Sequence, residues 1–209
     1  ESTKVKNVFP HFVDEGGWPA VVAEGSGRVH LTYFDDNKLM YAVKERSKKK
    51  WQFRTLGYCA NARFIAMAMA PDRSLHIIYS DLFDNYYGYI GSLSLMHHGV
   101  LAATGEWRSK IIGSNYIGSH SLSLDISDSG ELYLAWQEAR GAASPGNFWF
   151  RKTLNGVWQE PQLIDEYGYD HIDLAVDNEE NTHLSFYSLK YGFVYQKWTG
   201  DQPGPIELV

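Results

Sequence analysis

The 209-residue sequence has little of what marks several common protein classes. Cys59 is the only cysteine, so no internal disulfide can form, and a lone cysteine is usually a small buried hydrophobic side chain. No apolar run approaches the roughly 18 residues that suggest a membrane-spanning helix. The only basic run is Lys48 to Lys50, and the net charge is -6. We therefore expect neither a membrane span nor a nucleic-acid partner.

The start of the chain bears on where the protein acts. It lacks the charged and then apolar layout of a secretion signal, and it begins with Glu1 instead of methionine. A mature, exported form would start in this way, and we expect an extracellular or cell-surface location. Aromatic residues make up 15% of the chain, including 14 tyrosines. Such enrichment is common in proteins that bind sugars and in large all-β cores.

One segment recurs four times without gaps, and each copy places a tight turn before a strand of alternating hydrophobic residues. The copies are VAEGSGRVHLTYFD (Val22–Asp35), AMAPDRSLHIIYSD (Ala68–Asp81), DISDSGELYLAWQE (Asp125–Glu138) and AVDNEENTHLSFYS (Ala175–Ser188). One column of this register holds a ring: His30, His76, Tyr133 and His183. A second column ends the strand: Asp35, Asp81, Glu138 and Ser188.

Short alternating segments flank every copy, so each repeat predicts four strands, with almost no helical periodicity. Units of this kind indicate a β-propeller, in which each unit is a blade that stacks on its neighbours around an axis. We predict an all-β, single-domain propeller with four blades at about 19–56, 65–112, 122–163 and 172–209. Five blades, or a ring completed by oligomerisation, remain alternatives. The last outer strand would come from residues 3–8 or from PIELV at the C-terminus.

The last repeat reads IDLAVDNEENTHLSFYSLKYGFVYQKW (Ile172–Trp198), and the same pattern extends over nearly the whole chain. This pattern resembles the repeats of sialidase-like β-propellers, the bacterial neuraminidase repeats. The resemblance implies the fold but does not specify the function, because such propellers include glycosidases, polysaccharide lyases and lectins. The stretch SDSGELYLAW (Ser127–Trp136) differs in spacing and position from the sialidase Asp-box. Catalytic sialidases also typically have six blades, an arginine triad and a tyrosine–glutamate pair, which this sequence matches poorly.

Ligands of propellers usually bind on the face that carries the loops between blades and the loops after the second strand of each blade. The second and third repeats have the longest such loops, DLFDNYYGYIG (Asp81–Gly91) and QEARGAASPGN (Gln137–Asn147). We predict a site between them, in which aromatic rings stack on a sugar and polar groups bind its hydroxyls. The predicted binding residues are Trp18, Arg63, Tyr86, Tyr87, Tyr89, Asn115, Tyr116, His120, Glu138 and Arg140. An ordinary polar loop folded over the blade is the alternative.

The acidic column invites a catalytic interpretation, because glycoside hydrolysis uses paired carboxylates. If the protein were an enzyme, its catalytic residues would be Asp81, His120, Glu138 and Arg140. However, the acidic residue recurs with the blade, which favours a structural role in capping the following turn. Blade symmetry also separates the histidines, so we predict interblade hydrogen bonds for them, no metal site and no cofactor.

We therefore predict a lectin-like protein that binds a glycan, or a similar small polar ligand, through loops on one face. A small glycoside hydrolase or polysaccharide lyase is one alternative, and a protein-interaction scaffold is another. The sequence leaves homo-oligomerisation open.

Overall fold

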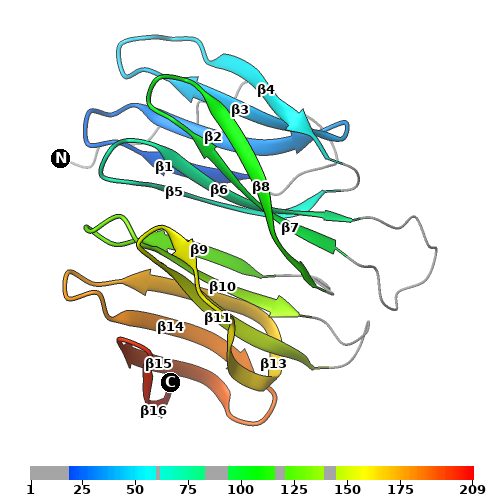
Figure 1. The fold of residues 1–209 in the computed structure, drawn as a ribbon, viewed down its shortest axis with the longest axis vertical. Coiled ribbons are helices and arrows are strands. Elements are labelled where there is room, and N and C mark those ends of the chain that lie inside the picture. The colour runs from blue at the N-terminus through cyan, green and yellow to red at the C-terminus, as the bar shows by residue number, and fades with distance from the viewer. Residues whose placement is uncertain (1–18, 60–61, 83–93, 116–120, 139–144) are drawn as a thin grey trace, which may run out of the picture.

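The computed structural model describes residues 19–59, 62–82, 94–115, 121–138 and 145–209. Within these ranges the chain forms strands and turns only, and every strand pairing is antiparallel (Figure 1). No helix in the described ranges is long and apolar enough to cross a membrane. The predicted all-β class is confirmed.

The strands group into four modules, which follow one another along the long axis of the molecule in Figure 1. Module one contains β1 (Ala20–Ala23), β2 (Val29–Asp35), β3 (Lys38–Lys44) and β4 (Gln52–Tyr58). Module two contains β5 (Arg63–Met69), β6 (Leu75–Leu82), β7 (Ser94–Leu101) and β8 (Trp107–Asn115). Module three contains β9 (Leu122–Ile126), β10 (Leu132–Glu138), β11 (Gly146–Leu154), β12 (Val157–Trp158) and the first half of β13 (Gln162–Val176). Module four contains the second half of β13, β14 (Thr182–Ser188), β15 (Gly192–Thr199) and β16 (Gln202–Leu208).

Strand β13 belongs to two modules, because its first half pairs with β11 and its second half with β14. Gly168, at the change of partner, pairs with both Gly146 and Ser188. The sequence suggests a loop at 165–171, so the continuous strand corrects that expectation. The tryptophan at 158 predicts that the outer strand of module three begins there. The strand begins instead at Gln162, because Trp158 turns back to pair with β11.

The first strands of the modules contact one another in chain order, β1 to β5, β5 to β9 and β9 to β13. Blades around a propeller axis have this arrangement. Among the described strands, no sheet closes on itself. Strand β16, which includes most of PIELV, pairs with β15 at the outer edge of module four, while residues 3–8 lie outside the described residues.

Hydrophobic side chains fill each seam between modules. Phe34 and Val43 share a buried cluster with Ile77 of module two, and Ile78 shares another with Trp136 of module three. The third seam joins Phe148 and Phe150 to module four, through Leu184, Phe186 and Trp198. Cys59 is buried in the first seam, and burial raises the pKa of its thiol to about 12. It is therefore an unreactive packing side chain, as the sequence predicts.

The first turn of each module (residues 24–28, 70–74, 127–131 and 177–181) has the same hydrogen bonds in all four copies. The amide of the first residue donates to the carbonyl of the fifth, and the amide of the fourth donates to the carbonyl of the first. The fourth residue always has a positive φ: Gly27, Arg73, Gly130 and Glu180. The gapless alignment of the four repeats is thus reproduced in the backbone.

Glu180→Gly is expected to raise the free energy of unfolding by about 0.5 kcal/mol. A left-handed conformation costs an L-residue roughly 1–2 kcal/mol, and glycine removes this strain. Glycine also loses more conformational entropy on folding, which offsets part of the stabilisation. Urea unfolding measures the change. Glu179→Gly is the control, since Glu179 has no positive φ and the variant should lose stability. A Glu180→Gly protein less stable than wild type would contradict the argument.

Candidate functional site

The site predicted on the long-loop face falls mostly outside the described residues. This applies to Trp18, Tyr86, Tyr87, Tyr89, Tyr116, His120 and Arg140. The backbones of Arg63 and Asn115 are described, and they pair with Ser80 and Ser94. Because these pairs and Asp81 lie at one end of module two, the topology brings Arg63, Asp81 and Asn115 to the same end of this module.

Glu138 and Asp81 are the two members of the predicted site whose side chains are described. Glu138 Oε2 accepts a hydrogen bond of 2.7 Å from the indole nitrogen of Trp149 and a longer one from Asn147. Asp81 Oδ2 lies 4.0 Å from Nε2 of His97 on the neighbouring strand. Burial lowers the pKa of His97, although Asp81 opposes this shift. Both carboxylates thus interact with the third strand of their own module, which supports the structural interpretation of the acidic column.

Glu138→Ala is expected to lower the free energy of unfolding by about 1–3 kcal/mol, because the Trp149 indole N–H loses its acceptor. Chemical denaturation of the two proteins gives the difference. Glu138→Gln keeps an oxygen that can accept from Trp149 and should lose less. Equal losses in the alanine and glutamine variants would argue that charge, and not the indole hydrogen bond, is what Glu138 supplies.

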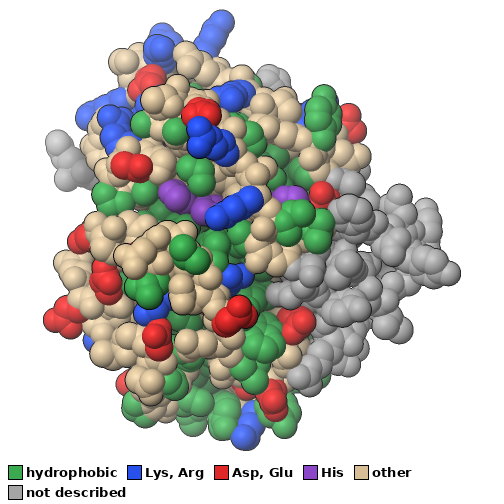
Figure 2. Space-filling view, viewed as in Figure 1, with side chains coloured by type: hydrophobic (Ala, Val, Ile, Leu, Met, Phe, Trp, Pro, Cys, Tyr) green, Lys and Arg blue, Asp and Glu red, His purple; other side chains and the backbone are tan. Residues whose placement is uncertain are grey.

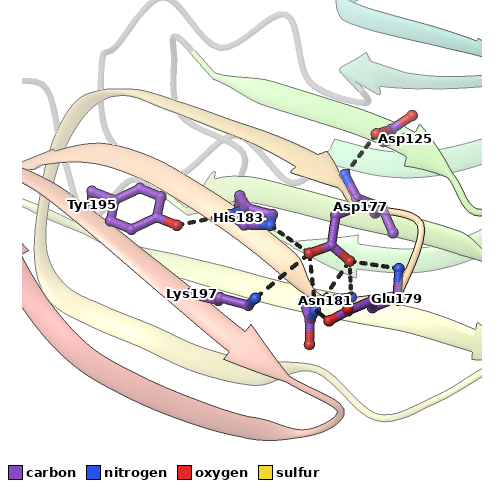
Figure 3. Close-up of polar contacts among 8 residues, drawn as sticks. Asp125, Asp177, Glu179, Asn181, His183, Tyr195 and Lys197 are labelled. Carbon is purple, nitrogen blue, oxygen red and sulfur yellow. Dashed lines mark hydrogen bonds and ion pairs between the residues drawn. The ribbon is translucent and has the colours of Figure 1, made fainter.

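The histidine column forms latches within modules. His183 joins Asp177, at 3.0 Å, to the hydroxyl of Tyr195, at 2.8 Å (Figure 3). In module one, His30 joins Glu24 and Tyr41 in the same way. Hydrogen bonds from Asn181 and then His183 hold the pKa of Asp177 below its usual range. Each latch ties the first turn of a module to its third strand.

Module two replaces the tyrosine of this latch with His98, whose Nε2 lies 2.9 Å from Nδ1 of His76. The indole of Trp158 in module three donates to His98 Nδ1 at 3.3 Å. This last bond crosses a seam, whereas the bonds of His30 and His183 stay within one module. The bonds described for His30, His76 and His183 stay within their modules, which corrects the interblade role predicted for this column. The bond that crosses a seam belongs to His98, which lies outside the column. No group of three or more His, Cys, Asp or Glu side chains in the described ranges is arranged to hold a metal ion.

An open groove of about 520 Å³ lies on the outer face of module four. Alternate side chains of β13, β14 and β15 point to opposite faces, so one set packs on module three and the other points toward the groove. Phe186 and Val194 of the buried set form the floor of the groove. The lining residues are Tyr169, His171, Asp173, Ser185, Phe186, Tyr187, Phe193, Val194 and Val209. Figure 2 shows hydrophobic side chains at the end of the molecule formed by module four.

Aromatic rings form a connected row in this groove. The Tyr187 ring lies 6.3 Å from Tyr169 and 5.0 Å from Phe193, and both neighbours meet it edge to face. Phe193 is 66% exposed and Tyr169 is 47% exposed. Polar groups stand beside them: His171, Ser185 and Asp173, whose Oδ1 accepts a hydrogen bond from Ser123. The groove therefore offers flat apolar surfaces next to donors and acceptors.

The turn between β14 and β15 adds a cation at the end of these strands. Lys190 Nζ lies 4.7 Å from the ring centre of Tyr191 and 5.9 Å from that of Tyr167. The interaction with the Tyr191 hydroxyl raises the pKa of Lys190. Tyr167 and Tyr191 are both exposed, so this end of module four presents further aromatic surface to solvent.

Comparison with known proteins gives structural similarity only. No family model matches the sequence, and no curated protein matches it. AofleA from Arthrobotrys oligospora is similar with a TM-score of 0.64 and 12% identity, over 92% of this chain and 56% of that one. The NanB sialidase from Streptococcus pneumoniae is similar with a TM-score of 0.59 and 14% identity, over 96% of this chain and 32% of the sialidase chain. An Aleuria aurantia lectin mutant in complex with Fucα1-6GlcNAc is similar with a TM-score of 0.59 and 11% identity, over 93% of this chain and 64% of the lectin chain.

The chain has the β-propeller fold of these sialidases and lectins. The predicted resemblance is thus confirmed for the fold. The propeller chain spans less than two thirds of the length of each of these three proteins.

Sequence reasoning missed the groove of this propeller, because it followed the long loops of the second and third repeats. The signal was present in the last repeat and the segment just before it, where Tyr167, Tyr169, Tyr187, Tyr191 and Phe193 lie within 27 consecutive residues. Their common face became visible only when β13 was shown to continue through the predicted loop. His171 also breaks the repeat pattern in the sequence, and it lines the groove.

Proposed function

We propose that this propeller binds carbohydrate, as lectins do, in the groove on module four. The observation that carries the proposal is the exposed row of Phe193 and Tyr169 beside His171, Asp173 and Ser185. Aromatic faces pack on the C–H faces of sugar rings, and neighbouring polar side chains bind the hydroxyls. The structural similarity to a lectin that binds Fucα1-6GlcNAc supports this class of ligand.

The blade count, the role of the long loops, the location and the oligomeric state are proposals as well. We propose that each module is one blade, so that the described chain contributes four blades. The residues predicted on the long loops would form a second contact region for the same class of ligand. An extracellular location and homo-oligomerisation also stay predictions.

A glycan array probed with the whole chain tests the function, and calorimetry with a glycan that binds tests the site. Phe193→Ala and Tyr169→Ala should each weaken binding by about tenfold, since one stacking surface contributes roughly 1–2 kcal/mol. Tyr58→Ala is the matched control, because Tyr58 is 82% exposed on module one, away from the groove. Unchanged affinity in both groove variants would move the site elsewhere, and an array without any binding would refute the function.

Hydrolysis is the competing hypothesis, because sialidases share the fold. The described members of the predicted catalytic set, Asp81 and Glu138, interact with side chains of their own modules. Turnover of a polysaccharide by the purified protein, abolished in Glu138→Gln, would replace the binding hypothesis with the enzymatic one.

A further inference from the structure

A second cavity, of about 200 Å³, lies between modules one and two. It is formed by the first turns of both modules and by the turn that joins β7 to β8, so it opens at the end opposite the long loops. Three guanidinium groups line it, from Arg28, Arg54 and Arg73. A water molecule takes about 30 Å³ in the liquid, so a volume of about 200 Å³ corresponds to about seven waters.

The guanidinium groups outnumber the carboxylates that face them. Glu24 is the acidic residue of the cavity lining, and its Oε2 accepts a 2.8 Å hydrogen bond from Arg73. Arg28 lies 3.0 Å from Glu45, outside the lining. Arg54 donates to the carbonyl of Gly105, a neutral acceptor. The cavity therefore has one positive charge more than the two carboxylates compensate.

Glu24 is ionised, and His30 and Arg73 hold its carboxylate in place in the cavity. Its side chain is 8% exposed, and its Oε1 lies 2.9 Å from Nε2 of His30. This hydrogen bond is the main cause that lowers the pKa of Glu24, ahead of the contacts with Ser26 and Arg73. Beside the arginines, the lining thus keeps a carboxylate acceptor and the Tyr41 hydroxyl group.

Module one also differs in charge from the rest of the chain, because its basic residues outnumber its acidic ones. Residues 20–58 contain eight Lys and Arg against four Asp and Glu, whereas residues 162–209 contain two against nine. Figure 2 shows Lys and Arg side chains concentrated over the end formed by module one. Such a potential attracts anions to this end of an otherwise acidic protein.

We propose that the cavity between modules one and two binds the carboxylate or sulfate group of an acidic saccharide. Arg54 and Arg73 bind the oxyanion, because a guanidinium fork matches two oxygens of either group. Glu24 and Tyr41 accept from hydroxyls of the attached sugar ring. Arg73 is 60% exposed, which leaves the anion a path from solvent. This site is separate from the groove on module four and does not depend on it.

Isothermal titration of the whole chain with glucuronate, with glucose as the uncharged comparison, tests the proposal. Glucuronate should bind, glucose should not, and inorganic sulfate should compete with glucuronate. Arg54→Gln should weaken glucuronate binding by about tenfold or more, since one charge-assisted contact is lost. Arg108→Gln is the matched control and should bind within about twofold of wild type, because Arg108 lies on the same side of module two, is paired with Glu106 and does not line the cavity.

Three results would overturn the proposal. Equal weakening in Arg54→Gln and Arg108→Gln would show a general charge effect without a site. Binding of inorganic sulfate, with no binding of glucuronate or of glucose 6-sulfate, would exclude an acidic saccharide as the ligand. Loss of glucuronate binding in Phe193→Ala would place the acid in the groove of module four, whereas binding retained in that variant separates the two sites.

Discussion

Acidification from pH 7 to pH 4 is expected to lower the free energy of unfolding by about 3 kcal/mol through His98 alone. Burial, then His76 and Lys110, lower the pKa of His98 from its ordinary value of 6.5 to about 3. Between these values the unfolded chain binds more protons than the folded one. Stability is therefore present above pH 6.5 and falls by about 1.4 kcal/mol for each pH unit below it.

The hydrogen bonds around His98 explain why protonation breaks the seam. An indole only donates, so Trp158 fixes His98 Nδ1 as an acceptor. His98 Nε2–H must then donate to His76, His76 to Ser74, and Ser74 to Asp72. Burial lowers the pKa of His76 as well, and the Ser74 hydrogen bonds lower that of Asp72. A proton added to His98 Nδ1 faces the indole N–H, and one added to His76 Nδ1 faces His98 Nε2–H.

His98→Gln is the matched variant, because a glutamine can accept from Trp158 and donate to His76 without titrating. Urea unfolding at several pH values between 7 and 4 should show a shallower loss in this variant than in wild type. The acid-sensitive carboxylates, Glu24 and Asp177 among them, contribute equally to both proteins and cancel in the difference. Parallel pH profiles would mean that His98 is not the buried neutral group described here.

Gly168→Ala is expected to destabilise the protein by about 3 kcal/mol, at the upper end of what overpacking costs. A Cβ atom at this position would lie 2.5 Å from the ring of Phe148. That ring is fully buried in the seam between modules three and four, so it has no room to move. The backbone cannot shift freely either, because the Gly168 carbonyl accepts from Gln137 and its pairings hold β11 and β14.

Gly113→Ala is the control for this experiment. Gly113 is also a strand glycine without a positive φ, and a Cβ there meets nothing within 4 Å. Its thermal unfolding should stay close to wild type, while Gly168→Ala should melt many degrees lower. Similar melting of the two variants would contradict the close packing of β13 against Phe148.

The repeats could be predicted from the sequence because every module has the same turn before its second strand. The turn at Ser127–Glu131 and the turn at Asp177–Asn181 have equivalent hydrogen bonds, and glycine at the fourth position of two copies marks the left-handed residue. The acidic and ring columns also follow from the repeat. Their partners could not be predicted, because His98 and Tyr195 occupy the same place in different modules and only three-dimensional packing pairs them.

The candidate sites were harder to predict, for physical reasons. The groove depends on β13 continuing through Gly168, and a stretch rich in Gly, Tyr and Asp is typical of loops as well as of strands. The arginine cavity gathers Arg28, Arg54 and Arg73 from separate segments. The spacing of these arginines along the chain does not show that they form a cluster. The opposite net charges of the first and last repeats, in contrast, can be counted from the sequence.

The central claim is that carbohydrate binds on module four, and a crystal structure with a glycan found on the array tests it most directly. The account predicts density for a sugar ring against Phe193 and Tyr169, with hydroxyls near His171 and Ser185. Density for the glycan only at the loops that follow Asp81 and Glu138, with no ligand in the groove, would contradict binding on module four.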